Sequence, residues 1–222
     1  MAVLRYYLDF ISPYAYLGWV QVQAMAQRRE LTLRPVPVLF AAMLDAFGHK
    51  GPAEIPPKRE YTFKHVLRLA HDLELALVPP PAHPFNPLLG LRIASLPMDA
   101  AARVRVIDLL FERTWGTGLG VTDPVAVARA LSAAGLPGEA LVAQAGTTEA
   151  KARVRQQTAD ALARGVFGVP SLELEGTGEV FWGQDSLPHF ERFADGQDPV
   201  DAELLERWRD LPAGSNRAAV KG

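Results

Sequence analysis

The sequence predicts an α/β fold, because strand-like runs near the two ends of the chain enclose a long helical middle. Residues 3–10 form a short apolar, β-branched and aromatic run that is typical of a strand. Two further runs, residues 171–175 and 179–182, flank a Gly-Thr-Gly turn and predict a hairpin. Between them, capping residues and apolar side chains at helical spacing predict successive helices.

The first strand leads directly into a helix that starts at Ser12-Pro13. Serine is favoured at the N-cap and proline at the first helical position, and Leu17, Val20 and Ala24 recur at helical spacing. Ser12 is therefore expected beside unpaired backbone N–H groups and the positive end of a helix dipole, which favour an anion. On local sequence alone, an ordinary capping serine is the simpler interpretation.

The second strand is expected at residues 31–40. Because Pro35 and Pro37 cannot donate to a ladder, this strand should lie at an edge of the sheet. After a short helical piece at 41–44, the glycines and prolines of residues 48–58 predict a loop. Further helices are predicted at residues 61–77, 98–115 and 123–134, and helices are expected to open at residues 136–138 and 147–149.

Composition limits the classes of partner. The 222-residue chain has 23 Lys plus Arg and 25 Asp plus Glu, and this balance carries no electrostatic signature of nucleic-acid or anionic-membrane binding. No apolar run approaches the roughly 20 residues of a membrane span. The first residues lack the pattern of a signal peptide and a strand begins at once, so we expect a cytoplasmic protein.

The chain contains no cysteine and five histidines without ligand spacing. Disulfides, thiolate metal sites and dithiol chemistry are thereby excluded, and no metal site is predicted. If a thiol takes part in the chemistry, a ligand must bring it.

Three motifs carry a family resemblance: Ser12-Pro13-Tyr14-Ala15-Tyr16, residues 165–170 and residues 181–185. Their order and separation resemble the 2-hydroxychromene-2-carboxylate isomerases and the related kappa-class glutathione transferases and DsbA family, over the chain to about residue 195. The resemblance implies a thioredoxin-like fold with an all-helical insertion. The expected thioredoxin-like domain comprises residues 1–61 and 150–222, and the insertion residues 62–149. It also implies a cis peptide bond between Val169 and Pro170.

The resemblance implies glutathione as the cofactor, with its thiol at Ser12. The Ser12 hydroxyl would donate to the sulfur, and the helix N-terminus would stabilise the thiolate. The backbone of Val169, presented by Pro170, would pair with the cysteinyl unit as an added strand does.

Three further residues are expected to bind the charged ends of glutathione. Lys58 would pair with a carboxylate, and Asp185 and Ser186 would meet the γ-glutamyl end. Asp185 also has a structural explanation, because an acidic residue is favoured at a helix start.

His49 and Asn86 are the residues that the resemblance implies for the substrate pocket. His49 stands where the family usually has Asn, although a neutral imidazole can still donate one hydrogen bond. A surface connector for the loop around His49, and a helix cap before Pro87 for Asn86, are the alternative interpretations.

The activity that the resemblance implies is isomerisation of 2-hydroxychromene-2-carboxylate to trans-o-hydroxybenzylidenepyruvate, through a transient adduct with the glutathione thiolate, in aromatic compound degradation. A homodimer acting on a small aromatic-derived substrate is expected. Two alternatives stay open: a kappa-class-like glutathione transferase or peroxidase, and a non-catalytic glutathione-binding protein.

Overall fold

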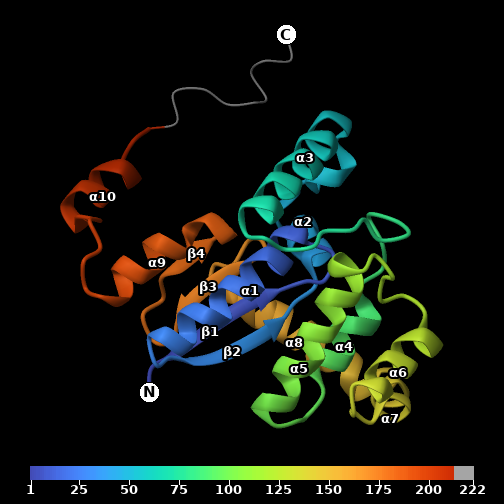
Figure 1. The fold of residues 1–222 in the computed structure, drawn as a ribbon. Helices are drawn as coiled ribbons and strands as arrows, with labels where there is room; N and C mark the ends of the chain where they lie inside the picture. Colours follow the sequence, from blue (N-terminus) through green and yellow to red (C-terminus); the bar gives the residue numbers. More distant parts are fainter. Residues whose placement is uncertain (213–222) are drawn as a thin grey trace. The chain divides into compact units, whose positions relative to one another are not determined.

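The computed structural model describes residues 1–212, and its trace is shown in Figure 1. Residues 1–187 form one compact unit, and the described residues from 188 on belong to a second. The two units are described separately. The site and its supporting sheet lie in the first unit.

A four-stranded mixed sheet forms the centre of the first unit (Figure 1). The strands are β1 (Val3–Leu8), β2 (Thr32–Pro37), β3 (Ser171–Leu174) and β4 (Val180–Trp182), in the order β2-β1-β3-β4. β1 pairs with β2 in parallel, with Tyr6 opposite Pro35 and Leu8 opposite Pro37. β1 and β3 are antiparallel, as are β3 and β4.

The edge position predicted for the second strand is confirmed, because β2 pairs only with β1 within the described sheet. Its two prolines remove hydrogen-bond donors that a central strand would need. The predicted hairpin is also confirmed as β3–β4. Gly176 (φ +90°) and Gly178 (φ +76°) form its turn in a backbone region that other residues rarely adopt.

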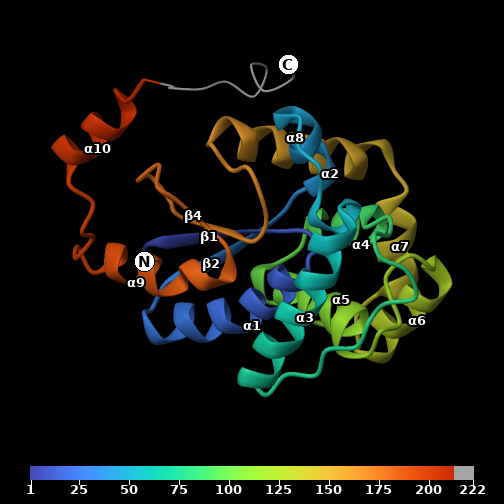
Figure 2. The same cartoon turned by 90° about the horizontal axis from the view of Figure 1, so that it is seen from above.

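Helices cover both faces of the sheet (Figure 2). On one side lie α2 (Phe40–Phe47) and α8 (Thr148–Ala163), and on the other lie α1 (Pro13–Arg28) and α3 (Pro56–Asp72). The segment between α3 and α8 holds α4 (Leu88–Ser95), α5 (Ala100–Phe111), a π-helical turn (Glu112–Gly116), α6 (Pro124–Ala133) and α7 (Gly138–Ala145). The predicted α/β fold with an all-helical stretch between β2 and β3 is confirmed.

The structure differs from the predictions at the third helix. The expected helix at residues 61–77 in fact spans Pro56–Asp72, because Pro56 and Pro57 occupy its first two positions, where a missing N–H costs nothing. The predicted loop is correspondingly shorter, and a 3₁₀ turn forms at Pro52–Glu54. Lys58 therefore lies in the first turn of α3. The domain boundaries expected at 61/62 and 149/150 fall inside α3 and α8, and the division into two domains stays a prediction.

A buried cluster between β1, α2 and α8 positions the loop before β3. It contains Tyr7, Met43, Ala161, Val166 and Val169. Val169 directs its side chain into this cluster and is only 7% exposed. Val166, in the same loop, is fully buried in this cluster too, so both side chains anchor the loop that carries Pro170.

The second unit contains two helices among its described residues. They are α9 (Leu187–Ala194), which begins at the boundary residue, and α10 (Ala202–Arg209). Asp201 caps α10 by accepting a hydrogen bond from the Leu204 amide at 2.7 Å. The sequence from residue 211 on predicts a loose tail, and residues 213–222 of it lie outside the described residues. Within residues 1–212, we find no helix with the length and apolarity needed to cross a membrane.

Candidate functional site

A cavity of about 610 Å³ lies where β1 ends and α1 begins. Five segments line it: the β1–α1 turn with the start of α1, α2, the 3₁₀ turn with the first half of α3, the turn at His83-Pro84, and the loops flanking β3 and β4. Of the residues expected in the site, the lining includes Ser12, Lys58, Val169, Pro170 and Asp185. Segments far apart in the sequence therefore meet at one place.

Ser12 is the N-cap of α1, as predicted. Its Oγ accepts a hydrogen bond from the Ala15 amide at 3.1 Å, and the residue is 9% exposed. That bond uses a lone pair and leaves the hydroxyl proton available to a ligand. The backbone amide of Tyr14 lies in the same first turn of α1. Its N–H group has no hydrogen-bond acceptor among the described residues. The end of α1 thus presents donors and a positive dipole to the cavity.

The Val169–Pro170 peptide bond is cis, which confirms the geometry that the resemblance implies. Pro170 extends the sheet, because its carbonyl accepts from the Gly183 amide at 2.9 Å. Within residues 1–212, neither the amide nor the carbonyl of Val169 has a hydrogen-bond partner. Val169 therefore offers an extended ligand one donor and one acceptor, the pattern of an added strand.

Opposite charges lie on different walls of the cavity. Lys58 comes from the first turn of α3, and Asp185 from the 3₁₀ turn Gln184–Ser186. Gly183, at φ +95°, lets the chain turn from β4 into that 3₁₀ turn, and a Cβ there would lie 2.3 Å from Asp185 Oδ1. The expected partner Ser186 is not in the lining, and its hydroxyl donates to the Gly183 carbonyl at 2.7 Å. Ser186 therefore supports the turn that carries Asp185.

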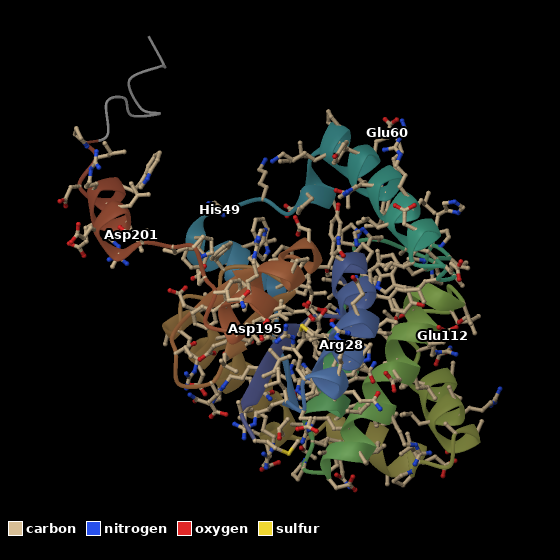
Figure 3. All side chains as sticks on the ribbon, turned by 60° about the vertical axis from the view of Figure 1, so that its left-hand side comes forward. Arg28, His49, Glu60, Glu112, Asp195 and Asp201 are labelled. Carbon is tan, nitrogen blue, oxygen red and sulfur yellow. The ribbon has the colours of Figure 1, made fainter. Side chains whose placement is uncertain are left out.

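His49 and Asn86 are not among the residues that line the cavity. His49 follows α2, is exposed and lies with its ring centroid 6.3 Å from that of Phe47 (Figure 3). The side chain of Asn86 accepts from the Leu88 amide at 3.0 Å, the capping interaction that the sequence offers as its alternative. Their roles in substrate binding stay predictions, and this geometry does not include them in the site.

A tyrosine–histidine pair in the cavity is absent from the sequence-based predictions. The Tyr14 hydroxyl lies 2.8 Å from Nδ1 of His65, and both residues line the cavity with Ser12. Tyr61 stacks on the His65 ring at a centroid distance of 5.7 Å. Burial and the neighbouring Tyr61 raise the pKa of Tyr14, and a hydrogen bond with Thr62 opposes them. Tyr14 stands two residues after Ser12, but no sequence signal connects it with a histidine in another helix.

Two polar side chains, one buried and one partly buried, hold the turn that carries Ser12. Asp9 is fully buried and accepts from the amides of Ile11 (3.1 Å) and Phe40 (2.9 Å), and burial raises its pKa to about 7. On the other side, Nε2 of His83 donates to the Ile11 carbonyl at 3.0 Å. Burial lowers the pKa of His83, which favours the neutral imidazole. Neither residue was singled out from the sequence.

Among the described residues, no group of three or more His, Asp or Glu side chains is arranged to hold a metal ion. The chemistry of the cavity therefore has to be argued from hydrogen-bond donors, charges and the phenol–imidazole pair.

The profile of the DSBA-like thioredoxin domain matches residues 3–194. The chain belongs to this family. The match covers the sheet, the helical segment and every element that lines the cavity.

The chain is similar to known isomerases and to known glutathione transferases. A 2-hydroxychromene-2-carboxylate isomerase of Pseudomonas sp. (strain C18) is 29% identical over 209 residues, covering 91% of this chain and 94% of that protein. Glutathione S-transferase kappa 1 of Homo sapiens is 22% identical over 198 residues, covering 82% of this chain and 85% of that protein. Among solved structures, a 2-hydroxychromene-2-carboxylate isomerase superposes with a TM-score of 0.80 at 25% identity, covering 95% of this chain and all of that one. The thioredoxin-like fold of the family is thereby shown.

Proposed function

We propose that this protein is a glutathione-dependent isomerase that converts 2-hydroxychromene-2-carboxylate to trans-o-hydroxybenzylidenepyruvate in aromatic compound degradation. One observation carries the proposal. In a chain without cysteine, the Ser12 hydroxyl at the start of α1 shares a cavity with the unpaired backbone of Val169. Such a site suits a thiol that arrives on a peptide ligand. The names of the similar isomerases supply the substrate class.

The residues of the cavity fit glutathione at three points. The amide and carbonyl of Val169 have no partner in residues 1–212, so a ligand backbone can pair with them. Lys58 and Asp185 carry opposite charges that match the carboxylate and amino groups of the tripeptide. Ser12 offers a hydroxyl proton beside the dipole of α1, which favours a thiolate over a thiol.

Bound glutathione would supply a nucleophilic thiolate for the conjugated system of the substrate, and it would be released unchanged. Ser12 would hold the sulfur by donating its hydroxyl proton, and the first turn of α1 would lower the pKa of the thiol. Tyr14 would donate its phenolic proton to the substrate oxygen that gains electron density, and His65 would orient that phenol through Nδ1. The apolar wall from Phe40 and Leu44 would exclude water from the reacting bond.

The similarity to the kappa-class transferases keeps a second candidate open. The same bound thiolate could attack an electrophile and leave as a conjugate, or reduce a peroxide, and glutathione would then be consumed. A non-catalytic glutathione-binding protein is the third candidate. It would use Val169, Lys58 and Asp185 without turning over any electrophile.

The deciding experiment measures substrate and free thiol in one reaction. A sub-stoichiometric amount of glutathione should convert many equivalents of 2-hydroxychromene-2-carboxylate and remain as free thiol at the end. Loss of one thiol per substrate, or reaction only with chloronitrobenzene-type electrophiles, would establish the transferase instead. Glutathione binding without either reaction would establish the binding protein.

We also propose a homodimer in the cytoplasm, as the family resemblance implies. Light scattering at micromolar concentration should give about twice the chain mass of 24.2 kDa. A mass equal to that of one chain would overturn the dimer.

A further inference from the structure

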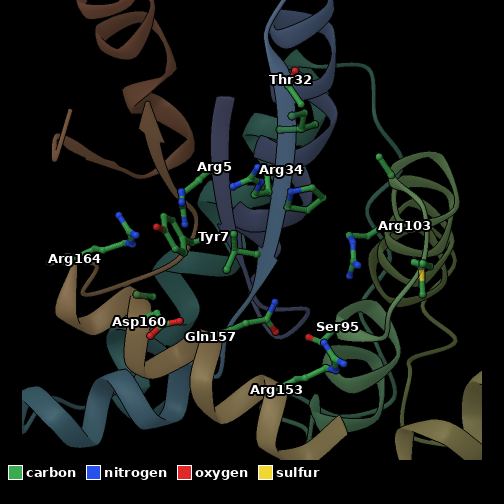
Figure 4. A pocket seen from close by; sticks show the side chains of 16 residues that line it. Arg5, Tyr7, Thr32, Arg34, Ser95, Arg103, Arg153, Gln157, Asp160 and Arg164 are labelled. Carbon is green, nitrogen blue, oxygen red and sulfur yellow. The ribbon is translucent and has the colours of Figure 1, made fainter. Parts of the chain in front are cut away.

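A second cavity, of about 510 Å³, lies beside the edge strand β2 and is lined by five arginines (Figure 4). They come from four elements: Arg5 from β1, Arg34 from β2, Arg103 from α5, and Arg153 and Arg164 from α8 and the residue that follows it. No residue lines both this cavity and the one at Ser12. The isomerase proposal therefore gives this cavity no role.

Three of these arginines have carboxylate partners. Arg5 and Arg34 both pair with Glu175, at 2.5 and 2.9 Å, and Arg164 pairs with the buried Glu173 at 3.2 Å. The two glutamates do not line the cavity themselves, whereas Asp160 does. Five positive charges thus face three negative ones, which leaves a formal excess of two positive charges.

The excess is concentrated at Arg103 and Arg153. Arg103 is partly buried and donates to the carbonyls of Ala94 and Leu96, the latter at 3.0 Å, at the end of α4. Within the described chain, neither Arg103 nor Arg153 has a carboxylate partner. Burial and the positive charge of Arg153 lower the pKa of Arg103, so the two guanidinium groups repel each other. A bound anion would remove that repulsion.

Polar side chains complete the wall between the two arginines. In Figure 4, Gln157 and Arg153 reach from α8 toward the space that Arg103 faces from α5. The Oε1 atom of Gln157 is buried without a hydrogen-bond partner in residues 1–212. Gln157 lines the cavity, and the NH₂ group on the other side of its amide can donate to an anion there. The cavity therefore has a carboxamide beside two arginines that have no carboxylate partner in residues 1–212.

We infer that this cavity binds the phosphate group of a small phosphorylated molecule, held by Arg103 and Arg153 with the Gln157 amide as an additional donor. A guanidinium presents parallel N–H donors that match phosphate oxygens, and two of them balance a dianion. The inference does not rest on the proposed isomerase activity, because the two cavities share no residue.

The experiment is isothermal titration of the full-length protein with inorganic phosphate and with pyrophosphate, against sodium chloride at equal ionic strength. We expect saturable binding of both phosphates and none of chloride. Arg153→Gln should weaken the binding about tenfold, the loss expected for one charge-assisted hydrogen bond. Arg153 is exposed and unpaired within the described chain, so its replacement should not disturb folding.

Two control variants locate the binding. Arg155→Gln removes an exposed arginine of the same helix that does not line the cavity, and it should leave the affinity unchanged. Lys58→Ala alters the Ser12 cavity and should also leave the phosphate affinity unchanged. The inference is overturned if phosphate binds no more than chloride does. It is equally overturned if Arg153→Gln and Arg155→Gln weaken binding alike, or if Lys58→Ala abolishes binding.

Discussion

The Tyr14 hydroxyl and Nδ1 of His65 lie 2.8 Å apart, which joins the first turn of α1 to the middle of α3 inside the Ser12 cavity. Tyr14 is thus a titratable residue two positions after Ser12 that lines the same cavity. Its pKa is raised by burial, so the phenol keeps its proton at neutral pH.

Replacing this phenol should impair turnover and spare glutathione binding. Tyr14→Phe removes only the hydroxyl, and we expect kcat to fall about 10²-fold, the lower range for a lost general acid. His65→Gln should have a smaller effect, because it removes only the group that orients the phenol. Initial rates at saturating glutathione measure kcat, and His71→Gln, on the exposed part of the same helix, is the control. If the kcat of Tyr14→Phe equals that of the wild type, Tyr14 is not the proton donor.

The two charged residues of the cavity should act on the glutathione requirement. Lys58→Ala and Asp185→Asn each remove a contact that binds glutathione equally in the ground and transition states, so the half-saturating concentration should rise several-fold with little change in the saturated rate. Lys64→Ala serves as the control, because Lys64 forms an exposed pair with Glu60 outside the cavity. If the half-saturating glutathione concentration rises equally in all three variants, Lys58 and Asp185 do not bind glutathione specifically.

Asp9 makes the stability of the protein depend on pH. Its folded-state pKa of about 7 lies above the ordinary value near 4, so between these values the native state binds more protons than the unfolded state. The stability that protonated Asp9 contributes is present in full below pH 4 and is lost as the pH rises toward 7. The total change is on the order of a few kcal/mol.

The comparison that isolates this contribution is denaturant unfolding of the wild type and Asp9→Asn across pH 4 to 7. As the pH rises, the free energy of unfolding of the wild type should fall relative to that of Asp9→Asn. Asp99→Asn, at an exposed helix cap, controls for the loss of one carboxylate and should follow the wild type. A constant difference between the wild type and Asp9→Asn would show that Asp9 does not titrate in this range.

Local chemistry made much of the fold predictable. Ser12 and Pro13 define the start of α1, and Thr147 and Asp123 define two later helix starts, because an N-cap depends on the residue and its immediate neighbours. Pro35 identifies the edge strand for a similarly local reason: it cannot donate to a ladder. The start of α3 was missed because prolines in a Gly/Pro-rich stretch favour a turn and a first helical position alike.

The part of the site that the sequence did not predict depends on contacts between distant residues. His65 is 51 residues from Tyr14, and His83 is 72 residues from Ile11. The Asp108 carboxylate accepts from Nε1 of Trp19 at 2.6 Å, across 89 residues of sequence. Helical spacing describes one element at a time and contains no information on which side chain of another element it will meet.

The central claim is that Ser12 and the first turn of α1 bind the thiol of glutathione as a thiolate. Ser12→Ala should leave the fold nearly intact at a cost of about 1 kcal/mol. Its turnover should fall much more than its glutathione affinity, because most binding contacts lie along the peptide. Thr147→Ala removes a similar cap from α8, away from the cavity, and should leave turnover unchanged.

The most direct test is a pH titration of the ultraviolet absorbance of the thiolate, with glutathione bound to the wild type and to Ser12→Ala. We expect the pKa of the bound thiol to lie well below about 8.5 in the wild type and to return toward that value in Ser12→Ala. A bound thiol with an unshifted pKa in the wild type, or the same lowered pKa in both proteins, would contradict the role of Ser12.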